Sequence, residues 1–258
     1  MTTLTGDLAA ELSTLVELVR QAQHVVILTG AGYSTRSGIP DFRSAGSGLW
    51  TKYLPMEVAS LTTFRHNPEL FFAWLHPLAS HMLLAQPNSA HLALAEMEAA
   101  GILKAIITQN IDGLHSRAGS KNVLEVHGTF NSLTCVGCFK RYSAKGVIEP
   151  YLETSAIPRC PQCGAILKPD IILFEEQLPV RIWQQAEKAC KACDLLLVAG
   201  TSLEVMPSAR LPVDVLSHGG KLAIINQSET FVDERADLVL RGDVVEIIPL
   251  LAREVIHD

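Results

Sequence analysis

The chain has 258 residues, of which 48% are hydrophobic, and a formal net charge of −6. This length suits one large domain carrying a smaller insertion, and the composition supplies a large core. The acidic balance and the absence of a Lys or Arg run exclude direct nucleic-acid binding as the main activity.

The N-terminus carries Asp7, Glu11 and Glu17 where a signal peptide needs a basic start and an apolar run. No stretch reaches the roughly 18 apolar residues that a membrane span requires. We therefore expect a soluble, cytoplasmic protein that does not bind membranes, and we expect it to be a monomer.

Six apolar runs rich in Val, Ile and Leu predict the strands of a parallel sheet covered on both faces. They lie at 24–29, 104–108, 122–126, 170–174, 194–199 and 221–225. Helical patterns alternate with these strands at 8–23, 88–100, 179–193, 207–217 and 244–257. The alternation predicts an α/β fold with a doubly wound, Rossmann-like parallel sheet.

Two stretches interrupt the alternation. Residues 44–86 contain Pro55, Pro68 and Pro77 in a helical pattern, and residues 129–168 carry four of the six cysteines. We interpret them as a helical module and a zinc module that together form a small inserted lobe. Residues 1–43, 87–128 and 169–258 would then make the Rossmann-like domain.

A glycine-rich turn follows the first predicted strand at Gly30 and Gly32. Glycines there permit positive φ and a close approach of the backbone to a pyrophosphate. The dinucleotide fingerprint is incomplete, because Thr35 replaces its third glycine and no acidic residue follows about twenty positions later. Arg43 could bind a phosphate in a bidentate manner and Phe42 could shield a reactive ring from water. The pattern also fits an ordinary tight turn and a surface loop.

Two Cys-x-x-Cys pairs separated by 21 residues predict a tetrahedral zinc site. The four cysteines are Cys135, Cys138, Cys160 and Cys163. Four thiolates leave no open position for water, so this zinc would be structural. Disulfides are the alternative, and they are less common in unexported proteins. We expect the third pair, Cys190 and Cys193, to be buried free thiols rather than a redox or metal pair.

Three polar residues follow the strand at 104–108: Gln109, Asn110 and Asp112. Ligands of doubly wound sheets bind outside the carboxyl ends of the strands, where such side chains can bind ribose hydroxyls and a carboxamide. His127 follows the strand at 122–126 and should face the same crevice, where it could act as a general base. We expect structural roles for His91 and His115.

Together these segments resemble the sirtuins, the NAD-dependent protein-lysine deacylases. The matching stretches are Gly-Ala-Gly-Tyr-Ser-Thr-Arg-Ser-Gly-Ile-Pro-Asp-Phe-Arg at 30–43, Thr-Gln-Asn-Ile-Asp-Gly-Leu-His at 108–115, His-Gly at 127–128 and the four-cysteine set. Residues 168–170, 200–203 and 225–226 also fit. The resemblance runs in order from about residue 20 to residue 250, and the chain looks most like the compact bacterial members.

The resemblance implies that NAD, as co-substrate, and an acyl-lysine peptide meet between the large domain and the lobe that holds the structural Zn²⁺. It implies pyrophosphate contacts from Ala31, Thr35 and Arg43, and nicotinamide contacts from Phe42, Ile111 and Asp112. It implies ribose contacts from Gln109 and Asn110, and adenosine-side contacts from Thr201, Ser202, Asn226 and Asp243. The catalytic residues would be His127, as general base, and Asn110. The products would be nicotinamide, O-acyl-ADP-ribose and free lysine.

Two other functions are compatible with parts of the pattern. A sirtuin-fold NAD hydrolase or ADP-ribosyltransferase would use the same crevice, but the zinc module, which helps to build the peptide cleft, favours the deacylase. A non-catalytic zinc-ribbon binding module would not need Asn110, Asp112 and His127 together.

The chain departs from the family pattern at one position and lacks a specificity motif at two others. Glu175 stands where family members usually have glycine, and its charge predicts a preference for substrate peptides with basic flanks. Leu75 and Leu78 align with the Tyr and Arg of members that prefer succinyl or malonyl groups. A buried acyl carboxylate would then lack a partner, so we expect acetyl or longer apolar acyl groups to be favoured.

Overall fold

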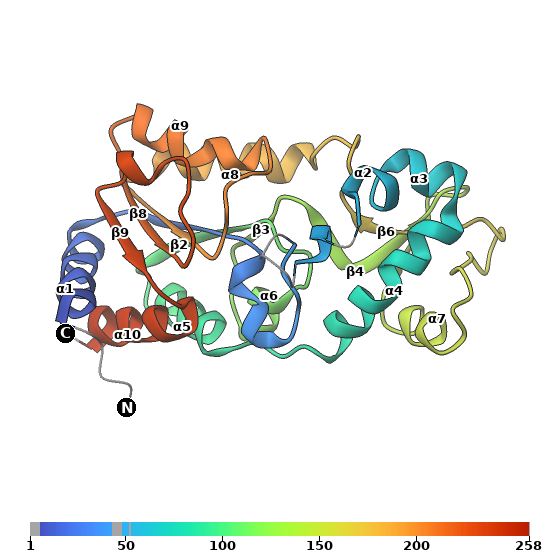
Figure 1. The fold of residues 1–258 in the computed structure, drawn as a ribbon, viewed down its shortest axis with the longest axis horizontal. Helices are drawn as coiled ribbons and strands as arrows, with labels where there is room; N and C mark the ends of the chain where they lie inside the picture. The colour runs from blue at the N-terminus through green and yellow to red at the C-terminus, as the bar shows by residue number, and fades with distance from the viewer. Residues whose placement is uncertain (1–5, 43–47, 52, 258) are drawn as a thin grey trace.

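The computed structural model describes residues 6–42, 48–51 and 53–257. Its main sheet has six parallel strands in the order β3-β2-β1-β7-β8-β9. The strands are β1 (Val25–Thr29), β2 (Leu103–Thr108), β3 (Val123–Glu125), β7 (Leu195–Ala199), β8 (Lys221–Asn226) and β9 (Leu238–Arg241). This order is that of a doubly wound dinucleotide-binding sheet, which confirms the predicted fold class (Figure 1).

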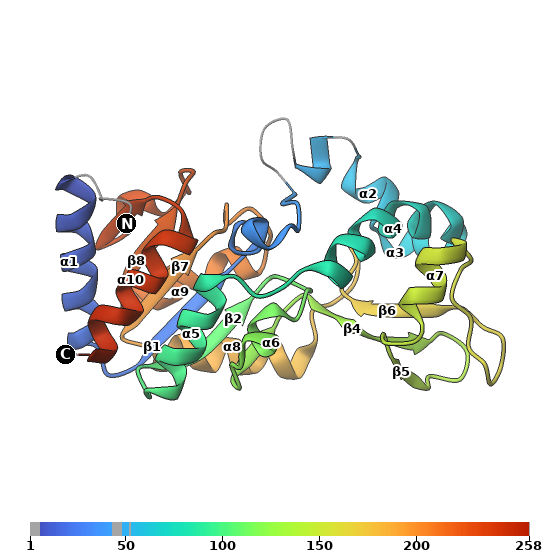
Figure 2. The ribbon, with the colours of Figure 1, turned by 90° about the horizontal axis from the view of Figure 1, so that it is seen from below.

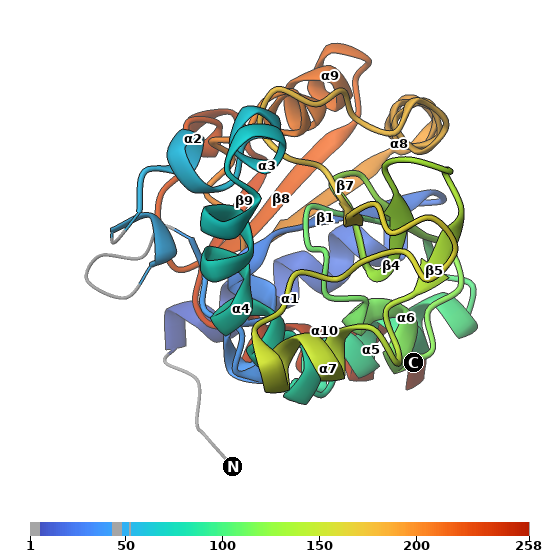
Figure 3. The same ribbon diagram turned by 90° about the vertical axis from the view of Figure 1, so that its right-hand side faces the viewer.

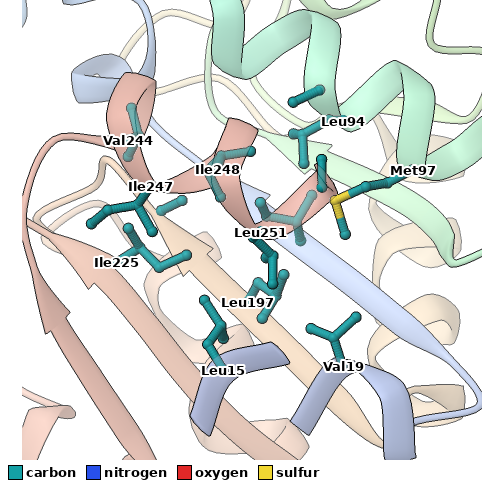
Figure 4. Close-up of a cluster of buried hydrophobic side chains, with 14 of the residues drawn as sticks. Leu15, Val19, Leu94, Met97, Leu197, Ile225, Val244, Ile247, Ile248 and Leu251 are labelled. Atoms are coloured by element: carbon teal, nitrogen blue, oxygen red, sulfur yellow. The ribbon is translucent and has the colours of Figure 1, made fainter. Parts of the chain in front are cut away.

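Helices cover both faces of this sheet. One face carries α1 (Gly6–Gln21), α5 (Ser89–Ala99) and α10 (Val244–His257), and the other carries α8 (Val180–Ala192) and α9 (Leu211–Ser217) (Figure 3). Because alternate strand residues point to opposite faces, Leu197 and Ile225 pack toward α1, α5 and α10 (Figure 4). Their neighbours Val198 and Ile224 belong to the core of the other face. Burial on both sides explains why the strands read as continuous apolar runs.

A smaller lobe lies beyond the carboxyl ends of the strands of the main sheet (Figure 2). It contains the helices α2 (Pro55–Val58), α3 (Leu61–His66), α4 (Pro68–Leu84) and α7 (Ile148–Thr154), and a sheet in the order β5-β4-β6. Its strands are β4 (Gly128–Cys135), β5 (Arg141–Ser143) and β6 (Leu167–Ile171). Strand β4 leads from the main sheet into this lobe (Figure 2). The lobe is built around one hydrophobic cluster, which Ile39 and Leu114 of the larger domain also join.

The prediction that residues 170–174 form a strand of the parallel sheet is wrong. The strand at this place, β6, is antiparallel to β4 in the small lobe. The carboxylate of Asp170 accepts hydrogen bonds from the hydroxyls of Ser132 and Thr134 on β4, at 2.5 and 2.6 Å. An apolar run indicates a strand but not its partner, and these side chains provide the pairing that the pattern did not reveal.

The remaining elements are short. α6 (Leu114–Ala118) follows the polar stretch after β2, and η4 (Ser208–Arg210) precedes α9, so the helix predicted at 207–217 begins as a 3₁₀ turn. In the part of the chain that the structure describes, no helix combines the length and apolarity that crossing a bilayer demands.

Candidate functional site

A cavity of about 780 Å³ lies at the carboxyl edge of the main sheet. Its walls come from the turn after β1, from the ends of β2, β7 and β8, and, on the other side, from α4 and the segment after β6. This is the place where doubly wound sheets bind their ligands. The cavity therefore joins a polar side on the main sheet to an apolar side on the small lobe.

The two glycines after β1 allow two turns to come together. The amide of Gly32 donates to the carbonyl of Gly200 at 2.9 Å. A Cβ on Gly30 would lie 2.6 Å from Cβ of Thr201, and one on Gly32 would lie 2.9 Å from the Gly200 oxygen. The expectation that these glycines supply positive φ is wrong, since Gly30 has φ −136° and Gly32 is not among the glycines with positive φ. Close packing against the end of β7 is what requires them.

A buried hydrogen-bond network connects this turn to the residues after β2. The side-chain amide of Asn110 donates to the Gly30 carbonyl at 2.9 Å and to Ser34 Oγ at 3.1 Å. Ser34 in turn donates to Asp112 at 2.7 Å, and the other carboxylate oxygen accepts from the amide of Leu114 at 2.8 Å. Burial raises the pKa of Asp112, although both hydrogen bonds favour its charged form. The network fixes Asn110 and Asp112 before any ligand binds.

His127 lies between β3 and β4 and lines the cavity. Its Nδ1 is 3.1 Å from the carbonyl oxygen of Gln109, and its Nε2 is 3.5 Å from Ser208 Oγ. A carbonyl oxygen can only accept, so Nδ1 carries the proton of the neutral ring. The lone pair is then on Nε2, which is the arrangement that a general base needs.

The other predicted residues meet around the same cavity. Gln109 donates to Thr201 Oγ1 at 2.9 Å, and Asn226 donates to the Thr201 carbonyl at 3.0 Å. Asp243 forms an ion pair with Arg36 at 2.8 Å. The cavity is lined by Ala31, Thr35, Phe42, Gln109, Asn110, Ile111, Asp112, His127, Thr201, Ser202, Asn226 and Asp243. Arg43 lies outside the described residues.

Sequence reasoning missed two serines of the site. Ser34 bridges Asn110 and Asp112, and Ser208 approaches both Gln109 and His127. Ser34 is part of the glycine-rich stretch, so its position was a usable signal. Ser208 is far along the chain, in η4, and its neighbours in the sequence give no indication of this contact.

The four cysteines of the small lobe form one cluster away from the cavity. Their sulfur atoms all lie within 4.8 Å of one another, and none is in a disulfide. The Cys135–Cys163 and Cys138–Cys160 sulfur pairs are 3.3 and 3.7 Å apart. A tetrahedral ion with Zn–S bonds of about 2.3 Å would space its thiolates by about 3.8 Å. The cluster therefore fits a structural zinc ion that offers no position to a substrate.

The residues expected to be structural are buried. His91 belongs to the capping box of α5, and His115 Nε2 is 3.0 Å from Thr29 Oγ1. Burial lowers the pKa of His91 to about 4 and that of His115 well below its ordinary value. Cys190 and Cys193 belong to the core between α8, α9 and the sheet, as predicted, and burial raises the pKa of Cys193 to about 12.

Known proteins are similar to this chain in sequence and in fold. A model of the Sir2 family matches residues 30–207. A protein named NAD-dependent protein deacylase 2, from Archaeoglobus fulgidus, is 42% identical over 246 residues, covering 95% of this chain and 96% of that protein. A solved Sir2 variant with a deacetylated p53 peptide and 3′-O-acetyl ADP-ribose is 40% identical with a TM-score of 0.87, covering 95% of this chain and 96% of its own. A Sir2 complex with a p53 peptide and NAD⁺ is 39% identical with a TM-score of 0.86, covering 94% and 98%.

Proposed function

The chain belongs to the Sir2 family, and on this premise we propose that it removes acyl groups from lysine side chains of proteins with NAD as co-substrate. The observation that carries the proposal is one cavity that is lined by His127, by polar residues at the sheet edge and by apolar side chains of α4. Its products are nicotinamide, O-acyl-ADP-ribose and the free lysine.

The cavity fits NAD. The strand order, the tight glycine turn and the polar residues at the strand ends are those of a dinucleotide site. In the proposed arrangement, the pyrophosphate lies on the turn of Ala31 and Thr35, with Arg43 as a further predicted contact. Thr201, Ser202, Asn226 and Asp243 hold the adenosine end. NAD supplies an electrophilic ribose carbon when its nicotinamide leaves.

The fixed network after β2 holds the reacting end. Asp112 binds the nicotinamide carboxamide, while Phe42 and Ile111 cover the ring and exclude water. Gln109 and Asn110 orient the ribose. Since the Asn110 amide is held by Gly30 and Ser34, little reorganisation is needed on binding.

His127 is the proposed general base. It accepts a proton at Nε2 from a ribose hydroxyl, while its bond to the Gln109 carbonyl holds the ring in the required tautomer. The acyl-lysine amide is a weak nucleophile, so its reaction depends on close placement and on a dry site. The apolar wall around Phe42, Ile111 and Leu78 provides both.

We propose the predicted division into a Rossmann-like domain and a small lobe of helical and zinc modules, except that β6 belongs to the small lobe. The hydrophobic clusters on the two faces of the main sheet and the cluster of the small lobe support this division. We also propose a cytoplasmic location, which six cysteines without disulfides suit. The monomeric state stays a prediction.

The test is to incubate the protein with NAD and an acetyl-lysine peptide, and to follow nicotinamide and peptide mass together. A deacylase releases one nicotinamide for each peptide that loses its acetyl group. Nicotinamide release at the same rate without peptide would favour the NAD hydrolase, and ADP-ribosylated protein would favour the transferase. No loss of the acyl group from any acyl peptide would contradict the deacylase, and no nicotinamide release with or without peptide would contradict the hydrolase as well.

A further inference from the structure

Glu175 has a backbone conformation that rarely suits a residue with a side chain. Its φ is +74°, and Phe139, Ser155 and Leu203 are the other non-glycine residues with positive φ in the described parts of the chain. Of these four, Glu175 lines the cavity. Glycine would take this conformation without strain. A glutamate held there requires interactions that compensate for the strain.

The side chain of Glu175 binds the first turn of α3. Its carboxylate accepts from the amide of Thr62 at 2.8 Å, a helix-start donor that has no acceptor within the helix. Hydrogen bonds from Thr62 lower the pKa of Glu175, and the positive charge of Arg65 adds to the effect. The exposed carboxylate is thus directed at α3 and its dipole.

The main chain makes the same connection one residue earlier. Phe174 donates to the Ala59 carbonyl at 3.0 Å and accepts from the amide of Leu61 at 3.0 Å. Together with the Glu175 contact, three hydrogen bonds join residues 174–175 to residues 59–62. Ala59, Phe174 and Glu175 all line the cavity, so this connection forms part of its wall.

The next residue anchors the opposite side of the turn. Glu176 accepts from the amide of Leu173 at 2.8 Å and forms an ion pair with Lys168 at 2.9 Å. Glu176 therefore holds the turn to its own strand, and Glu175 holds it to the helical module. The two adjacent glutamates have different structural partners.

We propose that Glu175 is a positioning residue, which fastens the turn at 173–176 to α3 and thereby sets the cavity wall at Phe174 against which the acyl-lysine substrate lies. The inference rests on the proposed deacylase function. It replaces the expectation that the charge of Glu175 selects basic peptide flanks, because the carboxylate is directed at Thr62.

Steady-state kinetics of Glu175→Gly and Glu175→Gln test this role. Glycine removes the hydrogen bond to Thr62 but accepts the positive φ, so the variant should fold. Its KM for acyl peptide should rise about threefold or more, at nearly unchanged kcat and NAD KM. Glutamine keeps an oxygen that can accept from Thr62, so its peptide KM should stay within about twofold of the unaltered protein. Glu57→Gln, which removes an exposed charge from α2 outside the cavity wall, is the matched control.

Two results would overturn the inference. An unchanged peptide KM in Glu175→Gly would show that the Glu175–Thr62 hydrogen bond does not position the cavity wall at Phe174. The second result would show that the charge itself acts on the peptide. It is a rise of the peptide KM in Glu175→Gln equal to that in Glu175→Gly, or a changed preference of Glu175→Gln between acidic- and basic-flanked peptides. Turnover by the unaltered protein is measured first, so failure of the deacylase proposal is recognised before the variants are compared.

Discussion

The ring of His127 is oriented by a hydrogen bond to the main chain. Its Nδ1 donates to the carbonyl of Gln109, the first residue after β2. The Gln109 side chain is itself held by Thr201, at the end of β7. A carbonyl keeps its acceptor character at every pH, so the pairing of neighbouring strands determines which nitrogen of the neutral ring bears the proton.

Replacing His127 with alanine should abolish most deacylation without unfolding the protein. Loss of a positioned general base lowers rates by about 10²- to 10⁴-fold, and we expect kcat for an acetyl-lysine peptide to fall within this range. Circular dichroism and the thermal midpoint should stay close to those of the unaltered chain. The exposed His66→Gln variant serves as control. Activity within tenfold of normal would mean that another group is the base.

The helix α4 presents an apolar face to the cavity. Trp74, Leu78 and Met82 are spaced four residues apart on this helix and line the cavity. Leu75 is fully buried and is not part of the lining, so of the two positions aligned with the Tyr and Arg motif only Leu78 lines the cavity. This face contains no charge that could pair with an acyl carboxylate.

The enzyme should therefore prefer apolar acyl groups to succinyl groups of similar length. An unpaired carboxylate against this face costs several kcal/mol, which corresponds to a ratio of kcat/KM of about 100 or more between butyryl and succinyl peptides. Competition between the two peptides, followed by mass spectrometry, measures this ratio. The Leu78→Arg variant should narrow it, and equal rates in the unaltered protein would contradict the assignment of this wall.

The helices α5 and α6 meet through two buried histidines. The rings of His91 and His115 lie 4.7 Å apart between their centroids, and both are essentially inaccessible to water. Their lowered pKa values keep both rings neutral at pH 7. Burial raises the pKa of Glu125 to about 7, so the folded protein binds this proton more tightly than the unfolded chain does. Glu125 therefore adds stability as the pH falls toward its ordinary pKa.

The two buried histidines should contribute a loss of stability in mild acid, against the opposite contribution of Glu125. The unfolded chain binds protons near its ordinary histidine pKa of about 6.5, whereas folded His91 stays neutral down to about pH 4. The stability that depends on neutral His91 is thus complete above pH 6.5. It is lost between pH 6.5 and 4, by up to about 1.4 kcal/mol per pH unit. The sign follows from the larger number of protons on the unfolded state.

Urea unfolding of His91→Gln at several pH values isolates the contribution of this ring. Glutamine can accept from the Asn88 amide, as His91 does at 3.3 Å, so the capping box is kept while the titration is lost. The variant should show a shallower decline of the unfolding free energy below pH 6.5, and His66→Gln should not. Identical slopes in His91→Gln and the unaltered chain would refute the assignment.

At the scale of the whole molecule, the sequence predicted what local pattern determines. Strands buried on both faces read as apolar runs, so five of the six predicted runs coincide with strands of the parallel sheet. The sixth, β6, joined the small sheet because its partner is fixed by the distant Ser132 and Thr134. The contact of Ser208 with His127 and the close packing that requires a glycine at position 30 could not be predicted either. Both depend on contacts between residues far apart in the sequence.

The zinc cluster should stabilise the small lobe independently of the parallel sheet. Cys135 and Cys160 are buried in the hydrophobic cluster of that lobe, together with Leu133 and Leu167 of its sheet. The main sheet has separate cores on its two faces. Removal of the metal should therefore remove the cross-link of the small lobe and leave both cores of the main sheet intact.

Hydrogen exchange read by mass spectrometry, with and without a zinc chelator, measures this separation. Chelation should remove protection from residues 129–168, while β7 and β8 keep theirs because their contacts lie within the main sheet. Peptide turnover should fall to background because α7 and β6 pack beside α4 in the same core, and zinc should restore it. Cys163→Ser should reproduce the effect without chelator. Loss of protection throughout the chain would instead mean that the two lobes fold as one cooperative unit.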